Sequence, residues 1–250
     1  MTDATIVTAA ILAIGDELLS GRTKDKNIGH LAQVLTLVGI DLKEVRIVPD
    51  DEEEIVAALN ALRARYTYVF TSGGIGPTHD DITADAVSRA FGVACIHDDE
   101  AMALLGAMYE RRGLDFTEAR QRMARMPQGA RHIPNAVSTA PGFIIGNVHV
   151  MAGVPQVFQA MVDALIPQLQ TGTPVQSRSV LSPFGEGDIG GPLAEVQKAH
   201  PETSIGSYPK FVGRNFSTDI VIRARDAGTL DAAENAVRAM LDTIAATRSA

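Results

Sequence analysis

The sequence predicts an α/β protein whose first domain has a mostly parallel sheet and whose second domain is small and α+β. Strand-like apolar runs alternate with stretches of helical periodicity up to about residue 170, a pattern typical of α/β domains. The first run, residues 10–14, is apolar at every position, as expected of a parallel strand covered on both faces. A composition shift at residues 170–174 indicates a linker, so we predict domains over residues 1–172 and 173–250.

The elements of the first domain follow from periodicity and from the residues that end helices. Apolar positions at helical spacing predict a helix over residues 27–38, which Gly39 ends. Asp50 precedes the acidic first turn of the next helix, so its expected local role is the N-cap. Further strands are predicted at residues 44–48, 66–70, 93–96, 143–145 and 149–151, and further helices at residues 51–62, 84–91, 98–112, 117–126 and 156–169. Residues 127–142 have little periodicity and predict an ordered loop beside the site.

The second domain is predicted from the same signals. Strands are expected at residues 177–182, 203–207 and 219–223, and helices at residues 193–200 and 230–246. Four glycines between residues 185 and 191 predict a turn before the first of these helices. Residues 206–210 and Arg214 are candidates for contact with a ligand, although a plain loop with solvated cations is the favoured alternative.

Residues 71–83, which read TSGGIGPTHDDIT, form the most informative stretch. They join a predicted strand to a predicted helix, and Gly73, Gly74 and Gly76 leave the backbone N–H groups free to surround an anion such as a phosphate. Asp80 and Asp81 would repel a bare phosphate, which indicates a divalent cation between protein and ligand. The alternative is that Asp81 only caps the following helix, since Thr78 and Asp81 have capping-box spacing.

Three other segments fall at predicted strand ends. Gly15, Asp16 and Glu17 follow the first strand, Asp50 follows the second, and residues 153–155 lead into a helix with Pro155 in its first turn. Ligands of parallel sheets bind beyond the carboxyl ends of the strands, so one crevice is expected to collect these segments and the glycine-rich loop. The alternative for Asp16 and Glu17 taken alone is a solvated turn.

Composition excludes several functions. The net charge of −8 and the pI near 5.2 give no basic footprint for nucleic acid or anionic lipid, so neither is an expected partner. A single cysteine, Cys95, precludes an internal disulfide and predicts a buried thiol in a cytoplasmic protein. The apolar start is too short to span a bilayer. The six histidines lack paired ligand spacing, and no Walker loop, dinucleotide-binding glycine motif or serine nucleophile elbow is present.

Together these motifs resemble a known family. Residues 14–21 (IGDELLSG), residues 71–83, and Asn27 and Asp50, with residues 140–143 (APGF) and 153–155 (GVP), occur in the order found in the molybdopterin-binding (MoaB/Mog-like) superfamily. The forms GPTHDD and GDELL resemble the amino-terminal domain of the competence/damage-inducible CinA family in particular. The resemblance implies a three-layer α/β/α domain, and residues 206–209 (GSYP) are similar to the small domain that follows it.

The resemblance also implies chemistry on a diphosphate. CinA-type domains are associated with metal-dependent cleavage of ADP-ribose, a similar domain beside FAD synthase with FAD hydrolysis, and molybdenum-cofactor relatives with an adenylylated pterin. We therefore expect a cytoplasmic nucleotide pyrophosphatase that forms dimers or trimers and takes a nucleotide or pterin. No deamidation is expected, because the sequence has no counterpart of the carboxy-terminal deamidase domain of CinA.

Roles for individual residues follow from this hypothesis. Asp81 and Asp80 are the predicted catalytic residues. The predicted ligands of Mg²⁺, or of Mn²⁺ or Co²⁺, are Asp16, Glu17, Asp50, Asp80 and Asp81. The predicted phosphate- or ligand-binding residues are Gly15, Asn27, Ser72, Gly73, Gly74, Gly76, Pro77, Thr78, Gly153, Val154 and Pro155. Two alternatives stay open: a non-catalytic molybdopterin-binding protein that uses the same crevice, and a structural or regulatory protein with a vestigial site.

Overall fold

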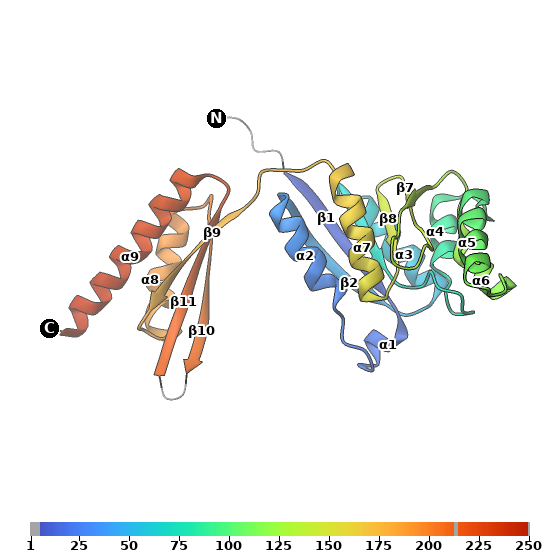
Figure 1. Ribbon diagram of the computed structural model, residues 1–250. Helices are drawn as coiled ribbons and strands as arrows, with labels where there is room; N and C mark the ends of the chain where they lie inside the picture. The colour runs from blue at the N-terminus through green and yellow to red at the C-terminus, as the bar shows by residue number, and fades with distance from the viewer. Residues whose placement is uncertain (1–5, 213–214, 250) are drawn as a thin grey trace. The chain divides into compact units, whose positions relative to one another are not determined.

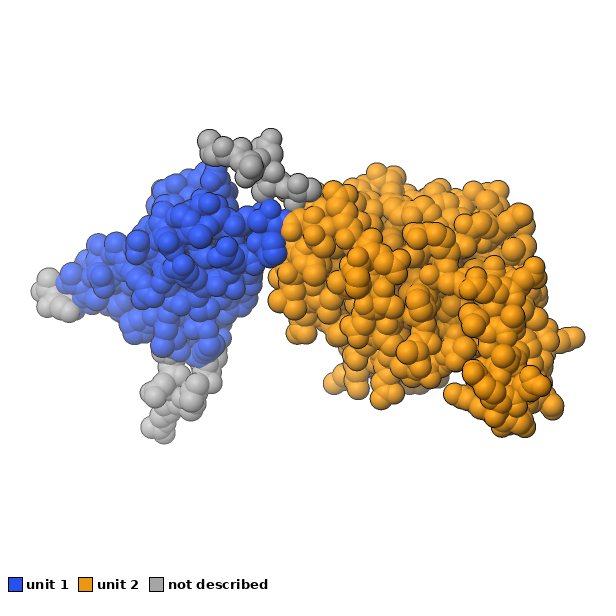
Figure 2. All heavy atoms as spheres, turned by 45° about the horizontal axis from the view of Figure 1, so that its top comes forward, with its two compact units in different colours: residues 1–4, 173–250 blue, residues 5–172 orange. Residues whose placement is uncertain are grey.

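The computed structural model describes residues 6–212 and 215–249, which form two compact units. One unit consists of residues up to Gly172 and the other begins at Thr173; Figure 2 shows them in different colours. Each unit has its own hydrophobic core. None of the described helices combines the length and the apolar character that a membrane crossing requires.

The first unit is built on a six-stranded sheet in the order β2-β1-β3-β8-β7-β6. Its strands are β1 (Val7–Ile14), β2 (Ile40–Val48), β3 (Tyr68–Ser72), β6 (Arg131–Ile133), β7 (Gly142–Ile145) and β8 (Val148–Met151). The pairs β1–β2, β1–β3 and β3–β8 are parallel, whereas β7 and β6 continue the sheet antiparallel. The predicted mostly parallel sheet is therefore confirmed.

Helices cover both faces of this sheet and give three layers (Figure 1). Helices α2 (Asn27–Leu37) and α7 (Pro155–Leu165) pack on one face, and α3 (Glu52–Arg63) and α4 (Thr83–Phe91) pack on the other. Along β1, Ala9 and Ile11 belong to the core on the α2 and α7 side of the sheet, and Leu12 and Ile14 belong to the core on the α3 and α4 side. This double burial explains why the strand is apolar at every position.

The predicted helix over residues 117–126 is wrong in its second half. The chain forms a short helix α6 (Glu118–Gln121) and a 3₁₀ turn η1 (Arg122–Ala124), and then a strand β5 (Arg125–Pro127) that pairs antiparallel with β4 (Cys95–His97). Met126, predicted to be the last residue of that helix, lies in this strand and is buried. The preceding helix α5 (Asp99–Arg111) is capped by Asp98, as its predicted start implies.

Two short elements have no counterpart among the predictions. A four-residue helix α1 (Asp16–Leu19) follows β1, and β6 lies inside the segment 127–142 that was predicted to be a loop. Both are too short to show a period in the sequence. Cys95 is half-buried rather than buried, and this partial burial raises the pKa of its thiol.

The second unit is a three-stranded antiparallel sheet in the order β10-β11-β9 with two helices packed against it. Its elements are β9 (Gln176–Ser182), α8 (Glu186–Ala199), β10 (Ser204–Val212), β11 (Asn215–Ala224) and α9 (Ala227–Ser249). The predicted glycine-rich turn is wrong, because Gly187, Gly190 and Gly191 lie within α8. Ile189 and Leu193, four residues apart, are both buried in the core, and this burial outweighs the low helix propensity of glycine.

His149 on β8 predicts a pH-dependent stability. The side chain is buried between the rings of Tyr68 and Phe70, and burial lowers the pKa of its imidazole from 6.5 to about 4. The folded state favours the neutral ring, whereas the unfolded chain takes up a proton near pH 6.5. The contribution of His149 to the free energy of unfolding is therefore fully present above pH 6.5 and is lost as the pH falls towards 4. We expect the free energy of unfolding of the wild type to drop by about 3 kcal/mol more than that of His149→Phe between these pH values. Urea unfolding at each pH measures the free energies of unfolding. An equal change with pH in both proteins would contradict the prediction.

Candidate functional site

Four loops meet at the carboxyl edge of the parallel strands and enclose a cavity of about 560 Å³. The register places Ile14 opposite Val48 and Ser72 opposite Met151, so the segments that follow these residues emerge side by side. The predicted residues that line the cavity are Gly15, Glu17, Asp50, Gly73, Gly74, Gly76, Pro77, Asp80, Asp81, Gly153, Val154 and Pro155. The structure thus brings the loops together at one place, as ligand sites of parallel sheets require.

The turn after β3 is fixed by close backbone contacts. Gly73 has φ of +111°, and a Cβ atom there would lie 2.3 Å from the backbone oxygen of Ile14. Gly74 has φ of +69°, and a Cβ atom there would lie 2.1 Å from Oγ1 of Thr83. That hydroxyl in turn donates to the Gly73 carbonyl at 3.0 Å. The two glycines are therefore required by conformation and by space.

Hydrogen bonds from Asn27 connect the end of β3, at Ser72, to Gly153. Nδ2 of Asn27 donates to Oγ of Ser72 at 2.7 Å and to the Gly153 carbonyl at 2.8 Å. Both side chains are buried, and they line a smaller cavity that adjoins the first. Their predicted role in ligand binding thus falls on the side cavity rather than on the main one.

The loop that carries Asp80 and Asp81, here called the acidic loop, is closed by hydrogen bonds between Thr78 and Asp81. The backbone N–H and the hydroxyl of Thr78 both donate to Oδ2 of Asp81, at 2.8 and 2.6 Å. Helix α4 begins only at Thr83, with Ile82 in the N-cap position, so Asp81 closes a turn and does not cap this helix. This finding excludes the alternative that Asp81 only caps a helix.

Arg122 holds the acidic loop from a distant segment. Its guanidinium, which comes from η1, donates from Nε to the Thr78 carbonyl at 3.1 Å and from Nη2 to the Asp81 carbonyl at 3.0 Å. Arg122 was not among the predicted residues, because a contact over more than forty positions leaves no local signal in the sequence. The pKa of Asp80 lies below its ordinary value. The first cause is the nearby hydroxyl of Thr78, and the second is a hydrogen bond from the backbone N–H of Asp80 itself.

Asp50 does not cap α3, so its predicted local role is wrong. Asp51 is the N-cap, and its side chain accepts the N–H groups of Glu53 and Glu54. Asp50 instead points to the cavity, where its Oδ2 accepts the backbone N–H of Asp16 at 3.0 Å. Partial burial raises the pKa of Asp50, and the neighbouring carboxylates add to this effect. Those neighbours are Asp16, Glu17 and Asp80.

All charged residues that line the main cavity are acidic. Glu17, Asp50, Asp80 and Asp81 line it, and no lysine, arginine or histidine is among the lining residues. No three His, Cys, Asp or Glu side chains of the described part of the chain are grouped closely enough to hold a metal ion by themselves. Mg²⁺ commonly binds through only one or two carboxylates and completes its shell with substrate phosphates and water. The donor set therefore fits a divalent cation that arrives together with a phosphorylated ligand.

The rest of the cavity lining is largely apolar. It includes Ile14, Ile75, Met123, Ala140, Ala152, Val157 and Met161 in addition to Pro77, Val154 and Pro155. The loop of residues 134–141 contributes Ser138 and Ala140. Met123, Val157 and Met161 were missed, since in sequence they are ordinary core positions of helices. These apolar side chains can accept a flat ring, and the carboxylates suit a charged group that is accompanied by a cation.

Three predicted or considered residues of the first unit lie apart from the lining of both cavities: Asp16, Thr78 and His79. Asp16 contributes its backbone N–H to Asp50, and Thr78 acts through Asp81. The side chain of His79 is fully exposed to solvent. Arg214 lies outside the described residues. In the second unit, Ser207 donates to Glu186 and Lys210 pairs with Asp219.

Fold and cavity together define an α/β protein with a cavity of small-molecule size at the carboxyl edge of its sheet. A family profile described as "probable molybdopterin binding domain" matches residues 10–171, and one described as "FAD synthase, middle domain" matches residues 174–249. The chain belongs to the molybdopterin-binding domain family, and within it to the group of the CinA amino-terminal domain. The resemblance carried by the sequence motifs is thereby confirmed.

Individual relatives agree with this assignment. A protein of Pyrobaculum arsenaticum is 38% identical over 211 residues, which make up 81% of this chain and 80% of that protein. A CinA-like protein of Desulfosudis oleivorans is 33% identical over 214 residues, 81% of this chain and 52% of that protein. The crystal structure of CinA from Thermoplasma acidophilum, described as of unknown function, has a TM-score of 0.60 and 32% identity over 65% of this chain and 98% of that one.

Proposed function

We propose that this protein is a metal-dependent nucleotide pyrophosphatase that cleaves the diphosphate of ADP-ribose, FAD or a similar nucleotide. The observation that carries the proposal is the composition of the main cavity: glycine turns able to bind a phosphate lie beside four carboxylates and no basic residue. A diphosphate would be repelled by such a lining unless a divalent cation accompanied it. The apolar residues of the lining supply a surface for the base.

The cation site belongs to the carboxylates that line the cavity. Asp80 and Asp81 would hold Mg²⁺, or Mn²⁺ or Co²⁺ in its place, with Glu17 as a further candidate ligand. The cation would neutralise the phosphate oxygens and lower the pKa of a bound water. Asp80 suits a ligand role because its depressed pKa keeps it ionised, and Arg122 fixes the loop that carries it.

Asp50 is the carboxylate best suited to accept a proton. Its raised pKa and its position in the cavity favour the role of general base, whereas the pKa of Asp80 is shifted in the opposite direction. Asp50 would take a proton from water as the water oxygen bonds to phosphorus and the phosphorus–oxygen bond of the bridge breaks. The backbone N–H groups of Gly73, Gly74 and Gly76 would hold the phosphate oxygens during this step. The products are two phosphate monoesters, one of them AMP.

The proposal predicts AMP release from ADP-ribose or FAD only when a divalent cation is present. The assay incubates the purified protein with each nucleotide and Mg²⁺, Mn²⁺ or Co²⁺, and measures AMP by chromatography. EDTA in excess of the metal is expected to reduce release to the level of the blank, and excess Mg²⁺ added afterwards is expected to restore it. Release that continues in EDTA would contradict the metal requirement, and no release with any nucleotide or metal would contradict the enzyme.

A non-catalytic molybdopterin-binding protein is the second candidate. The apolar lining, which includes Ile75, Met123, Val157 and Met161, suits a fused pterin ring as well as an adenine. Such a protein would need the glycine turns but not the proton acceptor. Tight pterin binding that is unaffected by EDTA, without any product, would favour this candidate over the pyrophosphatase.

A further inference from the structure

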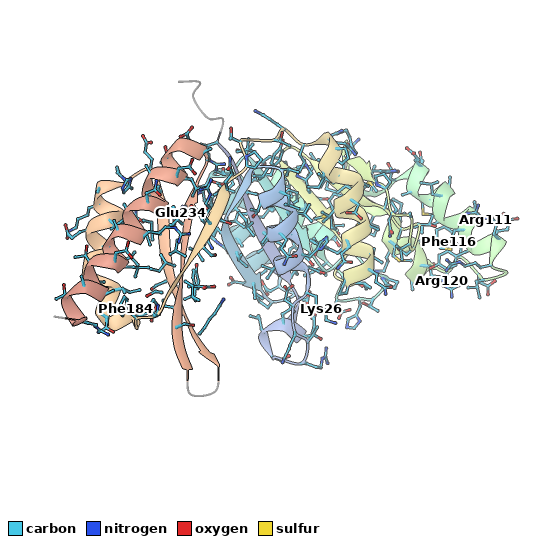
Figure 3. All side chains as sticks on the ribbon, turned by 60° about the vertical axis from the view of Figure 1, so that its left-hand side comes forward. Lys26, Arg111, Phe116, Arg120, Phe184 and Glu234 are labelled. Carbon is cyan, nitrogen blue, oxygen red and sulfur yellow. The ribbon has the colours of Figure 1, made fainter. Side chains whose placement is uncertain are left out.

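A hollow of about 660 Å³ lies apart from the two cavities of the candidate site. It is lined by His97, Glu118, Ala119, Gln121, Arg122 and Arg125, and is called the basic hollow here. These residues come from β4, from α6, where Figure 3 labels Arg120, and from η1 and β5. None of them lines the main cavity or the smaller cavity beside it, so the basic hollow is a separate site.

The charge of the basic hollow is opposite to that of the main cavity. Arg122 and Arg125 outnumber the single acid, Glu118, and His97 adds a ring that can donate a hydrogen bond. His97 lies directly opposite Arg125 in the register of β4 and β5, so both side chains leave the same face of this pair. In a chain with a net charge of −8, such a group of N–H donors indicates an anion as the ligand.

Both guanidinium groups are held in place and still have donors to spare. Arg125 is 22% exposed, and its Nη2 pairs with Asp85 on α4, which leaves Nε and Nη1 without a hydrogen-bond partner among the described residues. Arg122 uses Nε and Nη2 for the carbonyls of Thr78 and Asp81, and its Nη1 has no partner in the described part of the chain. Fixed guanidinium groups with free N–H donors are suited to binding phosphate oxygens.

A phosphate group fits these donors better than a carboxylate does. Its three or more terminal oxygens can accept from Arg122, Arg125 and His97 at once, whereas a carboxylate has only two oxygens. Glu118 and the ion pair of Arg125 with Asp85 reduce the attraction for an anion. We therefore expect a Kd on the order of 1 mM, which suits a site that responds to a change in concentration.

Arg122 connects the basic hollow to the acidic loop. The guanidinium that lines the hollow donates to two backbone carbonyls of that loop, those of Thr78 and Asp81. The same two residues close the loop through their own hydrogen bonds. An anion bound to the free side of Arg122 would hold its guanidinium against the carbonyls, so binding in the hollow would stabilise the closed loop.

We propose that the basic hollow is a regulatory site for a phosphate group and that Arg122 couples it to the acidic loop. The group is free orthophosphate or the phosphate of a nucleoside monophosphate, because the donors of the hollow recognise the phosphate alone. The inference rests on the proposed function only for its consequence, namely that a stabilised acidic loop holds the divalent cation more tightly. Phosphate binding and the response of the loop do not depend on catalysis.

The test is an NMR titration of the whole isotope-labelled chain with inorganic phosphate, in EDTA at neutral pH and constant ionic strength. Without a metal the charged lining of the main cavity is entirely acidic, so a bare phosphate is not expected to bind there. We expect the backbone amide signals of His97 and Arg125 to shift with a Kd on the order of 1 mM. The amide signals of Thr78 and Asp81 are expected to shift with the same Kd.

A parallel titration with AMP identifies the source of the phosphate group. A lower Kd for AMP than for inorganic phosphate, measured at the same amides, assigns the hollow to a nucleoside monophosphate. An equal or higher Kd assigns it to free orthophosphate.

Three variants separate binding from coupling. Arg122→Lys keeps the charge, but one ammonium cannot bond both carbonyls and also bind an anion, so the His97 shift is expected to remain and the Thr78 and Asp81 shifts to vanish. Arg125→Gln is expected to raise the Kd about 10-fold. Arg111→Gln changes an exposed arginine on α5 outside the hollow, also labelled in Figure 3, and is expected to keep the wild-type Kd.

The inference is overturned if the wild type shows no saturable shift at His97 and Arg125, or if Arg125→Gln keeps the wild-type Kd. Loop shifts that are absent in the wild type, or that persist in Arg122→Lys, overturn the coupling. Circular dichroism checks folding, and His97→Ala, with a Kd raised about 3-fold, decides if Arg125→Gln does not fold. Phosphate binding without AMP release would remove only the pyrophosphatase, and AMP release without phosphate binding would remove only this site.

Discussion

Replacing Asp81 by asparagine is expected to lower kcat for AMP release by about 100-fold or more while the fold is retained. Asparagine has the same shape, and its Oδ1 can still accept the N–H of Thr78 that closes the loop. What is lost is one of the negative charges that line the cavity, where it would hold the divalent cation against the diphosphate. Steady-state kinetics over a range of Mg²⁺ concentrations measure the effect, and circular dichroism checks the fold.

Two companion variants make this result specific. Asp163→Asn changes an exposed carboxylate on α7 outside the cavity and is expected to keep wild-type kcat. Asp50→Asn removes the proposed proton acceptor, so its loss of kcat is expected to persist at any Mg²⁺ concentration, whereas high Mg²⁺ should partly restore Asp81→Asn. A kcat for Asp81→Asn within a factor of two of wild type would refute a role in turnover.

The sequence was informative where a local pattern determines a global arrangement. The uninterrupted apolar run of β1 predicts burial on both faces, hence a parallel sheet with helices on each side. Parallel strands place all their carboxyl ends at one edge, so residues far apart in sequence, such as Asp50 and Gly153, can be assigned to one cavity before any contact is known. Glycine-rich turns mark that edge because few other residues can form them.

What the sequence could not supply depends on contacts across the chain or on a choice between neighbours. Asp50 and Asp51 have nearly the same local context, and only the structure shows that Asp51 caps the helix while Asp50 faces the cavity. Arg122 holds the acidic loop from a segment whose periodicity suggests only another turn of helix. The two cavities likewise arise from packing, since Thr23 and Met161 carry no pattern that distinguishes them from loop and core positions.

Replacing Gly73 by alanine is expected to destabilise the first unit by about 2–5 kcal/mol and to abolish ligand binding. The added Cβ would lie 2.3 Å from the backbone oxygen of Ile14, in a backbone conformation with φ of +111° that alanine rarely adopts. Conformational strain and overpacking each cost about 1–3 kcal/mol. Because the obstacle belongs to the backbone of β1, relief requires that the turn move away from Ile14, and this movement distorts the cavity that Gly73 and Gly74 line.

Gly21→Ala separates the two causes. Gly21 has φ of +71°, but nothing lies within 4 Å of the position of its Cβ, so alanine there meets strain without a clash and is expected to cost about 1 kcal/mol. Urea unfolding followed by circular dichroism gives the free energies of unfolding of the two variants. Calorimetry with the non-hydrolysable α,β-methylene analogue of ADP-ribose gives their affinities for the ligand. If Gly73→Ala is no less stable than Gly21→Ala and still binds the analogue, the contact with Ile14 does not hold the phosphate turn in place. A large loss in Gly73→Ala alone would show that the turn depends on the close approach of two backbones, a requirement that no side chain can replace.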